Sequence, residues 1–327
     1  LIPRILLACN NRTEYDTQQE PRIEVFSFID GEEIRRYRDK EFDMNLRIEK
    51  TEKIAGVVTP PSSKSHTIRA LFIASMAKGV STITNALVSD DTMHAWVVCE
   101  ALGARITKLP QGNGSGIHLE VEGHGTPLAL RSEKFFTGDS GITTRFLLPM
   151  LGLASAPAQT VTVDCGEQMR QRPLGPLINA LNHLGMTVGS TQQNDSCPLS
   201  CKGTLVGGNA TIDGATSQYI SALLLSLPCA ANNSVITVRN LNERPYVQMT
   251  TRWLDEQDIR YTWHQADGQD IFEVVGGQQY KPFQSAIPGD FSSASYLIAA
   301  GVLLGGEVVR AGLDMNDAQG DKRIIPI

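Results

Sequence analysis

The hydrophobic positions of the chain follow two different spacings, which alternate from residue 54 onward. In some segments apolar residues recur every three or four positions, as at Leu177, Leu181 and Leu184, and this predicts helices with one buried face. Other segments, such as TVTVDC at 160–165, are short, rich in β-branched residues and bounded by polar or small residues. That pattern is typical of strands, so the alternation predicts an α/β fold.

The order of these segments repeats three times between residues 54 and 277, each copy reading strand, helix, strand, helix, strand, strand. The predicted helices span 65–77, 91–102, 141–154, 173–184, 217–228 and 245–258. The predicted strands span 54–58, 81–85, 105–109, 117–123, 128–132, 160–165, 186–191, 197–203, 209–213, 234–239, 260–264 and 271–277. A fourth copy begins with a helix at about 292–304. The repeat predicts a domain made of three copies of one βαβαββ unit.

The first helix of each copy begins with hydroxyl groups or glycines, in SSKSHT, GDSGIT and ATSQY, and in GDFSSAS of the fourth copy. Such residues are ordinary N-caps when taken one at a time. If the copies are related by rotation, however, their helix N-termini converge, and each brings free N–H groups and the positive end of a helix dipole. We therefore expect an anion-binding site where they meet.

Cations stand near the same loop ends. Arg172 and Arg244 each precede a proline at a helix start, in GEQMRQRPLGPL and NERPYVQM. Three more cations near loop ends are Lys64, Arg69 and Arg145. A single arginine in such a place is most often a solvated surface charge, but a guanidinium fork matches phosphate and carboxylate groups. Their number favours a site for bound phosphate or carboxylate.

Composition narrows the classes of function. The chain has 327 residues, 41% of them hydrophobic and 20% charged, which suits a globular protein of about two domains. Its net charge of −6 argues against a general nucleic-acid or membrane surface, so an anion site must come from local cations. The six cysteines are scattered without a metal-ligand pattern, which favours reduced thiols and a cytoplasmic location. We expect no metal and no cofactor.

The two ends of the sequence differ from the middle. Residues 1–43 include the charged run IDGEEIRRYRDKEFD, and Met44 stands directly before the regular pattern. A native start at Met44, the tail of a fused neighbour and a genuine extension are the three alternatives for this segment. At the other end, DMNDAQGDKRIIPI stops where a new helix is expected to begin. This end therefore has the pattern of an incomplete sequence, which leaves two alternatives open: a native chain that continues beyond Ile327, or a truncated product.

Six segments together resemble the enolpyruvyl transferase superfamily, and within it the 5-enolpyruvylshikimate-3-phosphate synthase family. They are PSSKSHTIRA, GDSGITTRF, GEQMRQRPLGPL, DGATSQYISALL, RPYVQMT and PGDFSSASYLIAAG, in the family's order and spacing. The resemblance implies a two-domain clamp of repeated βαβαββ units, with the second domain only partly present. It implies an N-terminal extension at 1–43, a partial first domain at 44–58 and 287–327, and a complete substrate-binding domain at 59–286.

The reaction implied by the resemblance is transfer of the enolpyruvyl group of phosphoenolpyruvate to the 5-hydroxyl of shikimate 3-phosphate, with release of phosphate. It belongs to the shikimate pathway of aromatic amino-acid biosynthesis, proceeds through a tetrahedral intermediate and uses no metal. The family norm is a monomer, and the partners that the resemblance implies are the two substrates. Because both substrates are phosphorylated carboxylates, several cations are needed to bring them together. The family's acid/base carboxylates belong to the part of the enzyme that this sequence does not contain.

The resemblance also implies roles for individual residues. Lys64 is the implied catalytic residue and contacts both substrates. The residues implied for shikimate 3-phosphate are Lys64, Ser65, Arg69, Thr216, Ser217, Gln218 and Tyr246. Those implied for phosphoenolpyruvate are Lys64, Gly141, Arg172 and Gln218. Within the first group, Ser65 and Arg69 are expected to hold the shikimate carboxylate, and Thr216 with Ser217 its phosphate.

Three residues depart from the family pattern. Asp139 replaces a usual asparagine and is expected to repel an anionic substrate unless a cation compensates. Ile142 replaces a usual threonine and is expected to shift Gly141 and narrow the phosphoenolpyruvate side. Glu243 stands where a phosphate-binding serine is frequent, and the neighbouring Arg244 is expected to supply the missing positive charge.

Two other functions stay open on the sequence alone. One is the sister activity, UDP-N-acetylglucosamine enolpyruvyl transferase, whose family typically has Lys-Asn at the position of Lys64-Ser65 and a cysteine on a mobile loop. Near GEQMRQRP this chain has only Cys165 in the preceding strand, which disfavours that activity. The other is a truncated, non-catalytic protein that binds anions.

Several remaining polar residues have ordinary structural interpretations. His66 is interpreted as a helix-start side chain that tunes the local field, and Asp90 with Asp91 as a helix cap. Asp290 is expected to cap a helix, with a role in domain closure as the alternative. The histidines interpreted as structural are His94, His118 and His183.

Overall fold

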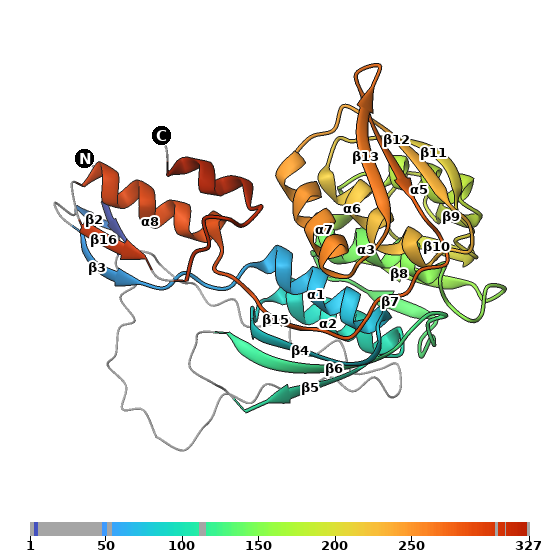
Figure 1. The fold of residues 1–327 in the computed structure, drawn as a ribbon, viewed down its shortest axis with the longest axis horizontal. Coiled ribbons are helices and arrows are strands. Elements are labelled where there is room, and N and C mark those ends of the chain that lie inside the picture. The colour runs from blue at the N-terminus through green and yellow to red at the C-terminus, as the bar shows by residue number, and fades with distance from the viewer. Residues whose placement is uncertain are drawn as a thin grey trace. The chain divides into compact units, whose positions relative to one another are not determined.

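The computed structural model describes residues 3–5, 48–50, 54–110, 116–304, 307–310 and 312–325 (Figure 1). The chain divides into a larger compact unit, Val57–Ile298 with Val309–Ile327, and a smaller one, Leu1–Gly56 with Ala299–Val308. The predicted extension at 1–43 lies outside the described residues except for strand β1 (Pro3–Ile5), which pairs antiparallel with β2 (Ile48–Lys50).

Three four-stranded sheets in the larger unit share one topology. The first has the order β15 (Gln284–Ala286), β4 (Lys78–Ala86), β6 (Ile117–His124), β5 (Arg105–Leu109). The second has the order β7 (Lys134–Phe136), β8 (Val161–Asp164), β10 (Leu199–Gly203), β9 (Met186–Ser190). The third has the order β11 (Gly208–Asp213), β12 (Ser234–Arg239), β14 (Gln269–Val274), β13 (Tyr261–Ala266). In each sheet only the first two strands pair in parallel, so the predicted α/β repeat is confirmed.

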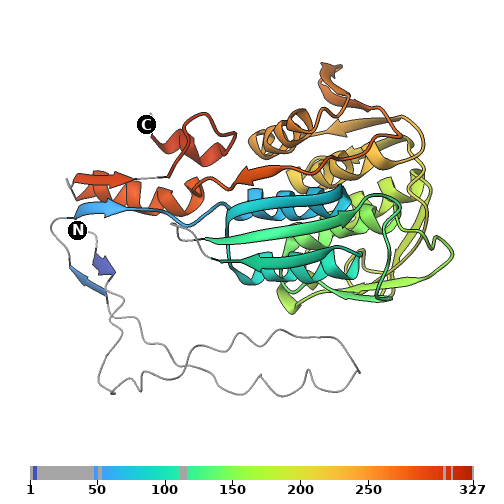
Figure 2. The same cartoon turned by 60° about the horizontal axis from the view of Figure 1, so that its bottom comes forward.

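Each unit contributes a buried first helix and a more exposed second helix. The first helices are α1 (Lys64–Met76), α3 (Gly141–Leu151) and α6 (Ser217–Ser226). Every residue of α3 is buried, as is all of α1 from His66 onward, which is the burial expected of central core helices. The helices gather in the interior of this unit and the sheets lie around them (Figures 1 and 2). The N-termini of the first helices are thereby held by the core.

The second helices cover this interior with one apolar face each. They are α2 (Asp90–Ala101), α5 (Gly175–His183) and α7 (Arg244–Glu256), with the short α4 (Glu167–Arg170) before α5. Leu177 and Leu181 of α5 are fully buried, as the three- and four-residue spacing predicts. The remaining elements are α8 (Phe291–Leu303), η1 (Leu227–Cys229) and η2 (Gly320–Ile324).

The predicted strand at 54–58 does not belong to the first sheet. It forms β3 (Ala55–Val58), which pairs with β16 (Glu307–Arg310) in a separate two-stranded sheet. The parallel edge strand of the first sheet is instead β15, with Ser285 opposite Ile83. The first unit is therefore completed by a segment that follows the third unit in the chain.

Two other predicted elements are placed differently. Residues 128–132 form only an isolated bridge at Leu128, because Arg131 binds the end of α2 and the turn after it, donating to the carbonyls of Ala101, Gly103 and Ala104. The strand of that unit is β7, slightly later in the chain. The helix predicted at 173–184 starts two residues later, at Gly175, with Pro176 in its first turn, where the missing N–H breaks no intrahelical bond.

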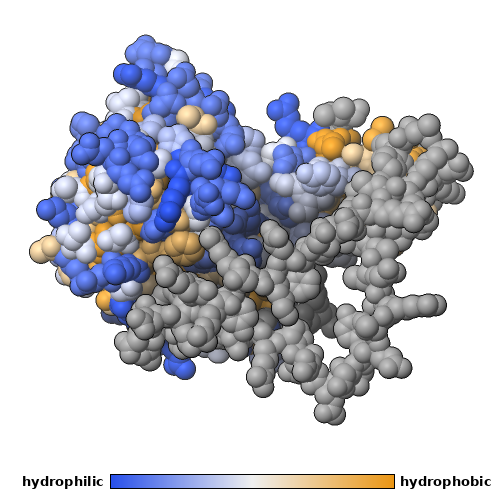
Figure 3. Space-filling view, turned by 180° about the vertical axis from the view of Figure 1, so that it is seen from behind, coloured by the Kyte–Doolittle hydropathy of each residue, from blue (hydrophilic) through white to orange (hydrophobic). Residues whose placement is uncertain are grey.

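Hydrophilic residues cover most of the described surface in the view of Figure 3. Large apolar side chains are exposed on α8, where Tyr296 is 80% and Val302 is 76% accessible. Within the described part of the chain, no helix has both the length and the apolar character that a membrane crossing demands.

Candidate functional site

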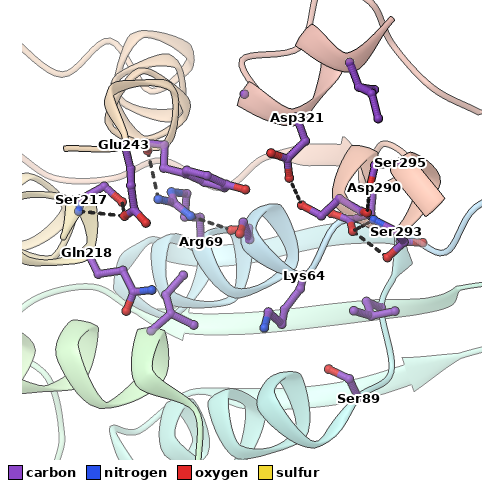
Figure 4. Close-up of a pocket in the computed structure, with 18 of the residues that line it drawn as sticks. Lys64, Arg69, Ser89, Ser217, Gln218, Glu243, Asp290, Ser293, Ser295 and Asp321 are labelled. Atoms are coloured by element: carbon purple, nitrogen blue, oxygen red, sulfur yellow. Dashed lines mark hydrogen bonds between the residues drawn. The ribbon is translucent and has the colours of Figure 1, made fainter. Parts of the chain in front are cut away.

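A pocket of about 850 Å³ lies in the larger unit at the N-terminal ends of α1 and α6 (Figure 4). Six of the sequence-predicted site residues line it, namely Lys64, Ser65, Arg69, Ser217, Gln218 and Tyr246. They come from three different helices, α1, α6 and α7. The pocket therefore assembles segments that are far apart in the sequence.

Lys64 is the first residue of α1, and its ammonium reaches into the space at the centre of Figure 4. Its Nζ lies 2.7 Å from Oδ2 of Asp91 on α2, and the lysine side chain is 49% exposed. The first turn of α1 contains no acidic residue. Before it, the buried hydroxyls of Ser62 and Ser63 have no hydrogen-bond partner among the described residues. Two buried hydroxyls at this end of α1 are therefore uncommitted.

Arg69 lies one turn further along α1 and is only 1% exposed. Its guanidinium donates to Thr250 Oγ1 at 2.9 Å and to the carbonyls of Ser65 and Tyr246 at 2.9 and 3.1 Å, with a longer bond to Ser221 Oγ. Burial lowers its pKa to about 9, so the group stays charged at neutral pH. All four acceptors are uncharged, and an anionic ligand would complement this buried cation.

Gly141 begins α3 beside two arginines. A Cβ placed on Gly141 would lie 2.5 Å from Nη1 of Arg145 and 3.2 Å from Nη1 of Arg172, so a larger residue would displace the ends of these side chains. Arg145 is 5% exposed, and its Nη1 donates to Gln218 Oε1 at 2.6 Å. Burial lowers the pKa of Arg145, and the charge of Arg172 adds to this effect. Gln218 thus links Arg145 to the pocket, which neither Gly141 nor Arg172 lines.

Glu243 places a carboxylate on the N-terminus of α6. Its Oε2 accepts from the backbone N–H of Ser217 at 3.1 Å, from Ser217 Oγ at 2.8 Å and from Thr216 Oγ1 at 3.3 Å. Figure 4 shows Glu243, Ser217 and Gln218 together on one side of the pocket. Thr216, the N-cap of α6, does not line the pocket itself but joins it through this carboxylate.

Arg244 does not supply positive charge to this end of α6, contrary to the expectation from sequence. Its Nη1 donates to Asp270 Oδ1 at 2.8 Å, and its Nη2 donates to the other oxygen of the same carboxylate. Asp270 on β14 is 3% exposed on its side chain and also accepts from Trp263 Nε1 at 2.8 Å. This buried acceptor directs the guanidinium toward the third sheet.

The carboxylate of Asp139 is bound at the start of α4. Its Oδ1 accepts from the backbone N–H of Met169 at 3.1 Å, in the first turn of α4, and its carboxylate lies against Gly166. The negative charge is thus bound by a helix N-terminus, which favours anions. Ile142 is buried and lines the pocket, as its position beside Gly141 implies.

The last described segments close the pocket on the side opposite Glu243 (Figure 4). Asp290 accepts from the N–H and Oγ of Ser293, which confirms its interpretation as a cap, here of α8. Asp321 accepts from Ser292 Oγ, and Arg323 also lines the pocket. Sequence reasoning did not assign Asp321 or Arg323 to the site, because their segment comes near it only through the tertiary fold.

His66 and the acidic pair at α2 have structural contacts. Nδ1 of His66 accepts from Trp253 Nε1 at 3.0 Å, so the ring proton is on Nε2, which donates to Asp317 Oδ1 at 3.1 Å. The cap of α2 is Ser89, in a reciprocal capping box with Thr92, and not Asp90 or Asp91. Asp91 instead pairs with Lys64.

Two further groups of the site stand out in the sequence, although the family resemblance gave neither of them a substrate to bind. Arg145 is the only charged residue of the helix GITTRFLLPML, and a lone cation in a buried helix is a signal for a functional or structural anion partner. Glu243 is visible in the sequence only as a departure from the family pattern. Among the described residues, no group of three or more His, Cys, Asp or Glu side chains is arranged to hold a metal ion.

Comparison with solved structures and known sequences agrees with this architecture. The fold resembles EPSP synthase from Acinetobacter baumannii with a TM-score of 0.64 at 21% identity, covering 82% of this chain and 57% of that one. A 3-phosphoshikimate 1-carboxyvinyltransferase from Acetivibrio thermocellus is 42% identical over 285 residues, covering 87% of this chain. One from Methanococcus maripaludis is 35% identical over 286 residues, covering 86% of this chain.

The chain spans 64% of the length of each of these two relatives. The sequence model of the family EPSP synthase (3-phosphoshikimate 1-carboxyvinyltransferase) matches residues 48–327. Its match covers all three repeated units and the pocket. The chain therefore belongs to the EPSP synthase family.

Proposed function

We propose that this chain carries out the reaction named for its relatives, in which the enolpyruvyl group of phosphoenolpyruvate is transferred to the 5-hydroxyl of shikimate 3-phosphate and phosphate is released. The observation that carries the proposal is the meeting of Lys64, Ser65, Arg69, Ser217, Gln218 and Tyr246 around one pocket. The buried charge of Arg69, bonded only to neutral acceptors, supports an anionic ligand.

The shikimate 3-phosphate would lie between α1 and α6. Ser65 and Arg69 are proposed to hold its carboxylate, and Thr216 with Ser217 its phosphate, with Gln218 and Tyr246 beside them. The distribution of donors supports this orientation, because a guanidinium fork suits a planar carboxylate while a helix N-terminus with two hydroxyls suits a phosphate.

Phosphoenolpyruvate is proposed to bind beside α3, with its phosphate at Arg172 and the N–H of Gly141. The two guanidiniums of Arg145 and Arg172 near Gly141 support this choice. They would offset the repulsion between two phosphorylated carboxylates in one pocket. Gln218, bonded to Arg145, would then contact both substrates.

Lys64 is proposed to lie between the two substrates. In the reaction the 5-hydroxyl oxygen bonds to C2 of phosphoenolpyruvate, the hydroxyl loses its proton and the methylene carbon gains one. Phosphate then leaves with cleavage of its C–O bond, and a proton leaves the methyl group to restore the enol ether. The ion pair with Asp91 would hold the Lys64 ammonium in position at the target hydroxyl.

In the cell we propose a cytoplasmic monomer of the shikimate pathway, acting in aromatic amino-acid biosynthesis without nucleic-acid or membrane partners. The proposed organisation is an extension at 1–43, a partial first domain at 44–58 and 287–327, and a substrate-binding domain at 59–286. The three repeated sheets within Lys78–Ala286 support the last of these.

The test is calorimetric titration of the chain with shikimate 3-phosphate, followed by phosphate release on addition of phosphoenolpyruvate. Lys64→Gln should weaken binding by roughly tenfold, because one charge-assisted contact is lost, and should abolish phosphate release. Lys78→Gln, at the start of β4, is the matched control. Binding of UDP-N-acetylglucosamine in place of shikimate 3-phosphate would refute the proposal and favour the sister activity.

A second candidate is a protein that binds shikimate 3-phosphate without catalysis. It is favoured by the donors around the pocket, which suit the binding of an anion whether or not a transfer follows. Binding of shikimate 3-phosphate with no phosphate release at saturating phosphoenolpyruvate would establish this candidate. Release of phosphate that requires both substrates would exclude it.

A further inference from the structure

The backbone of Glu243 is unusual for its residue type. It has φ 52° and ψ 41°, in the left-handed region, directly before α7. Such angles are uncommon for residues other than glycine, asparagine and aspartate. An N-cap residue normally bonds its side chain to its own helix, yet the Glu243 side chain makes no such bond to α7. The conformation instead sends its carboxylate across to α6.

At α6 the carboxylate occupies a complete anion site. A single oxygen, Oε2, accepts from the N–H of Ser217 and from the hydroxyls of Ser217 and Thr216. Ser217 is 2% exposed, whereas Glu243 is exposed to solvent. The two donors of Ser217 are therefore fixed in the core, whereas Thr216 is half-buried and the acceptor is at the surface.

The charges around this site attract an anion. Arg145 is 5% exposed, its Nε has no partner among the described residues, and it is bonded to Gln218, the neighbour of Ser217 in α6. Burial lowers the pKa of Arg145, while the charge of Glu243 acts in the opposite direction, as expected of groups that attract each other. Arg244, the cation adjacent in sequence, is committed to Asp270. Glu243 is thus the anion that this site holds in the protein.

We propose that Glu243 is an internal anion that occupies the phosphate subsite, so that a phosphorylated ligand must displace its carboxylate before it can bind. The inference rests on the proposed function, which assigns Thr216 and Ser217 to the phosphate of shikimate 3-phosphate. The two anions need the same donors and repel each other at contact distance. Glu243 thereby sets how strongly the pocket prefers a phosphorylated ligand over the same ligand without phosphate.

The test measures the binding of shikimate 3-phosphate and of shikimate to the whole chain and to Glu243→Gln and Glu243→Ser. Both variants remove the competing charge, so the affinity for shikimate 3-phosphate should rise by about tenfold or more. The affinity for shikimate, which lacks the phosphate, should change by less than about twofold. Glu120→Gln on β6 removes the same charge outside the pocket and should leave both affinities unchanged. Thermal unfolding of each variant shows that it is folded.

Two results would overturn the inference. An unchanged ratio of the two affinities in Glu243→Gln would show that the carboxylate does not compete with phosphate. Weaker binding of shikimate 3-phosphate by Glu243→Gln would show that Glu243 supports the donors instead of blocking them.

Inorganic phosphate separates this inference from the proposed function. If neither shikimate ligand binds to any variant, the proposed function fails. Thermal stabilisation by inorganic phosphate then tests whether Glu243 competes with phosphate. Stronger stabilisation of Glu243→Gln than of the wild-type chain supports the internal anion. Equal stabilisation overturns it.

Discussion

At the scale of single residues, the direction of a carboxylate side chain decides its contacts more than its position in the sequence does. Asp139 stands two residues before Gly141, but its Oδ1 is bonded to the N–H of Met169. It therefore serves as a cap for α4, the segment that leads to Arg172. An asparagine at this position offers the same acceptor oxygen, so the two residue types are equivalent in this contact.

Replacement of Asp139 separates the acceptor from the charge. Asp139→Asn should change the free energy of unfolding by less than about 0.5 kcal/mol, because the hydrogen bond to Met169 is kept. Asp139→Leu removes the acceptor and should cost about 1 to 2 kcal/mol, the usual loss for a helix cap. Urea denaturation measures both. Equal destabilisation by the two variants would show that the charge and not the hydrogen bond is important.

Asp317 makes the stability of the folded state depend on pH in the acid range. Its side chain is 5% exposed, and burial alone would raise its pKa, but hydrogen bonds from His66 and Gln319 outweigh this effect and lower the pKa to about 2. A free aspartate titrates near 3.9. The folded state therefore gains stability from this ionised group above about pH 4, and loses it as the pH falls through about 2.

Asp317→Asn should lower the free energy of unfolding by on the order of 2 kcal/mol at pH 7, and this deficit should shrink between pH 4 and pH 2. Denaturation curves at a series of pH values provide the measurement. Asp314→Asn, an exposed aspartate in the same segment, is the control and should show a small, constant difference. A deficit for Asp317→Asn that does not vary with pH would contradict the linkage.

At the scale of elements, α7 is attached to the third sheet by its first residue. Nη1 and Nη2 of Arg244 both donate to the buried carboxylate of Asp270 on β14, and Trp263 of β13 donates to the same carboxylate. Loss of the arginine would leave a buried charge without its cation, which is the costly way to break an ion pair. The contact therefore fixes where α7 begins.

Arg244→Ala should destabilise the fold by about 1 to 3 kcal/mol, less than for a fully buried pair because the Arg244 side chain is 42% exposed. Arg252→Ala, an exposed arginine of the same helix, should cost less than about 0.5 kcal/mol. A double-mutant cycle with Asp270→Asn measures the coupling. Additive effects in that cycle would mean that Arg244 stabilises the fold in some other way.

Much of the element order was predictable from sequence, because helices such as α5 and α7 and strands such as β5 and β12 carry strong local patterns. The failures came where a distant partner decides the outcome. Residues 128–132 have the composition of a strand, but Arg131 binds the end of α2. The opposite directions of Glu243 and Arg244 are also set by distant partners, Ser217 and Asp270, which no local pattern reveals.

At the scale of the whole larger unit, the three sheets are alike but one of them is built from two distant parts of the chain. β15 pairs with β4, and Asn85 reinforces the junction. The Asn85 side chain donates to the carbonyl of Ile287 at 2.8 Å and accepts from the N–H of Gly116 at 3.1 Å, with a backbone φ of 56°. Sequence pattern identified three units but assigned the wrong first strand to two of them, 54–58 in the first unit and 128–132 in the second.

Asn85→Gly keeps the left-handed backbone and removes both side-chain bonds, so it should cost about 1 to 2 kcal/mol. Asn85→Ala adds backbone strain and should cost roughly 1 kcal/mol more. Hydrogen exchange of the peptide around 283–287 should accelerate in both variants. Asn179→Ala, an exposed residue of α5, is the control. Unchanged exchange at 283–287 would show that Asn85 does not hold β15 in place.

Because β15 comes late in the sequence, the first sheet can be completed only late in the synthesis of the chain. Phe283 bonds to Ser81 across 202 residues of chain, so the unit that leaves the ribosome first has an open edge at β4 until the third unit has been made. An unpaired strand edge is a template for pairing with other chains. Folding of the first unit requires closure of this long loop, and aggregation of nascent chains should therefore depend on how quickly translation proceeds from β4 to β15.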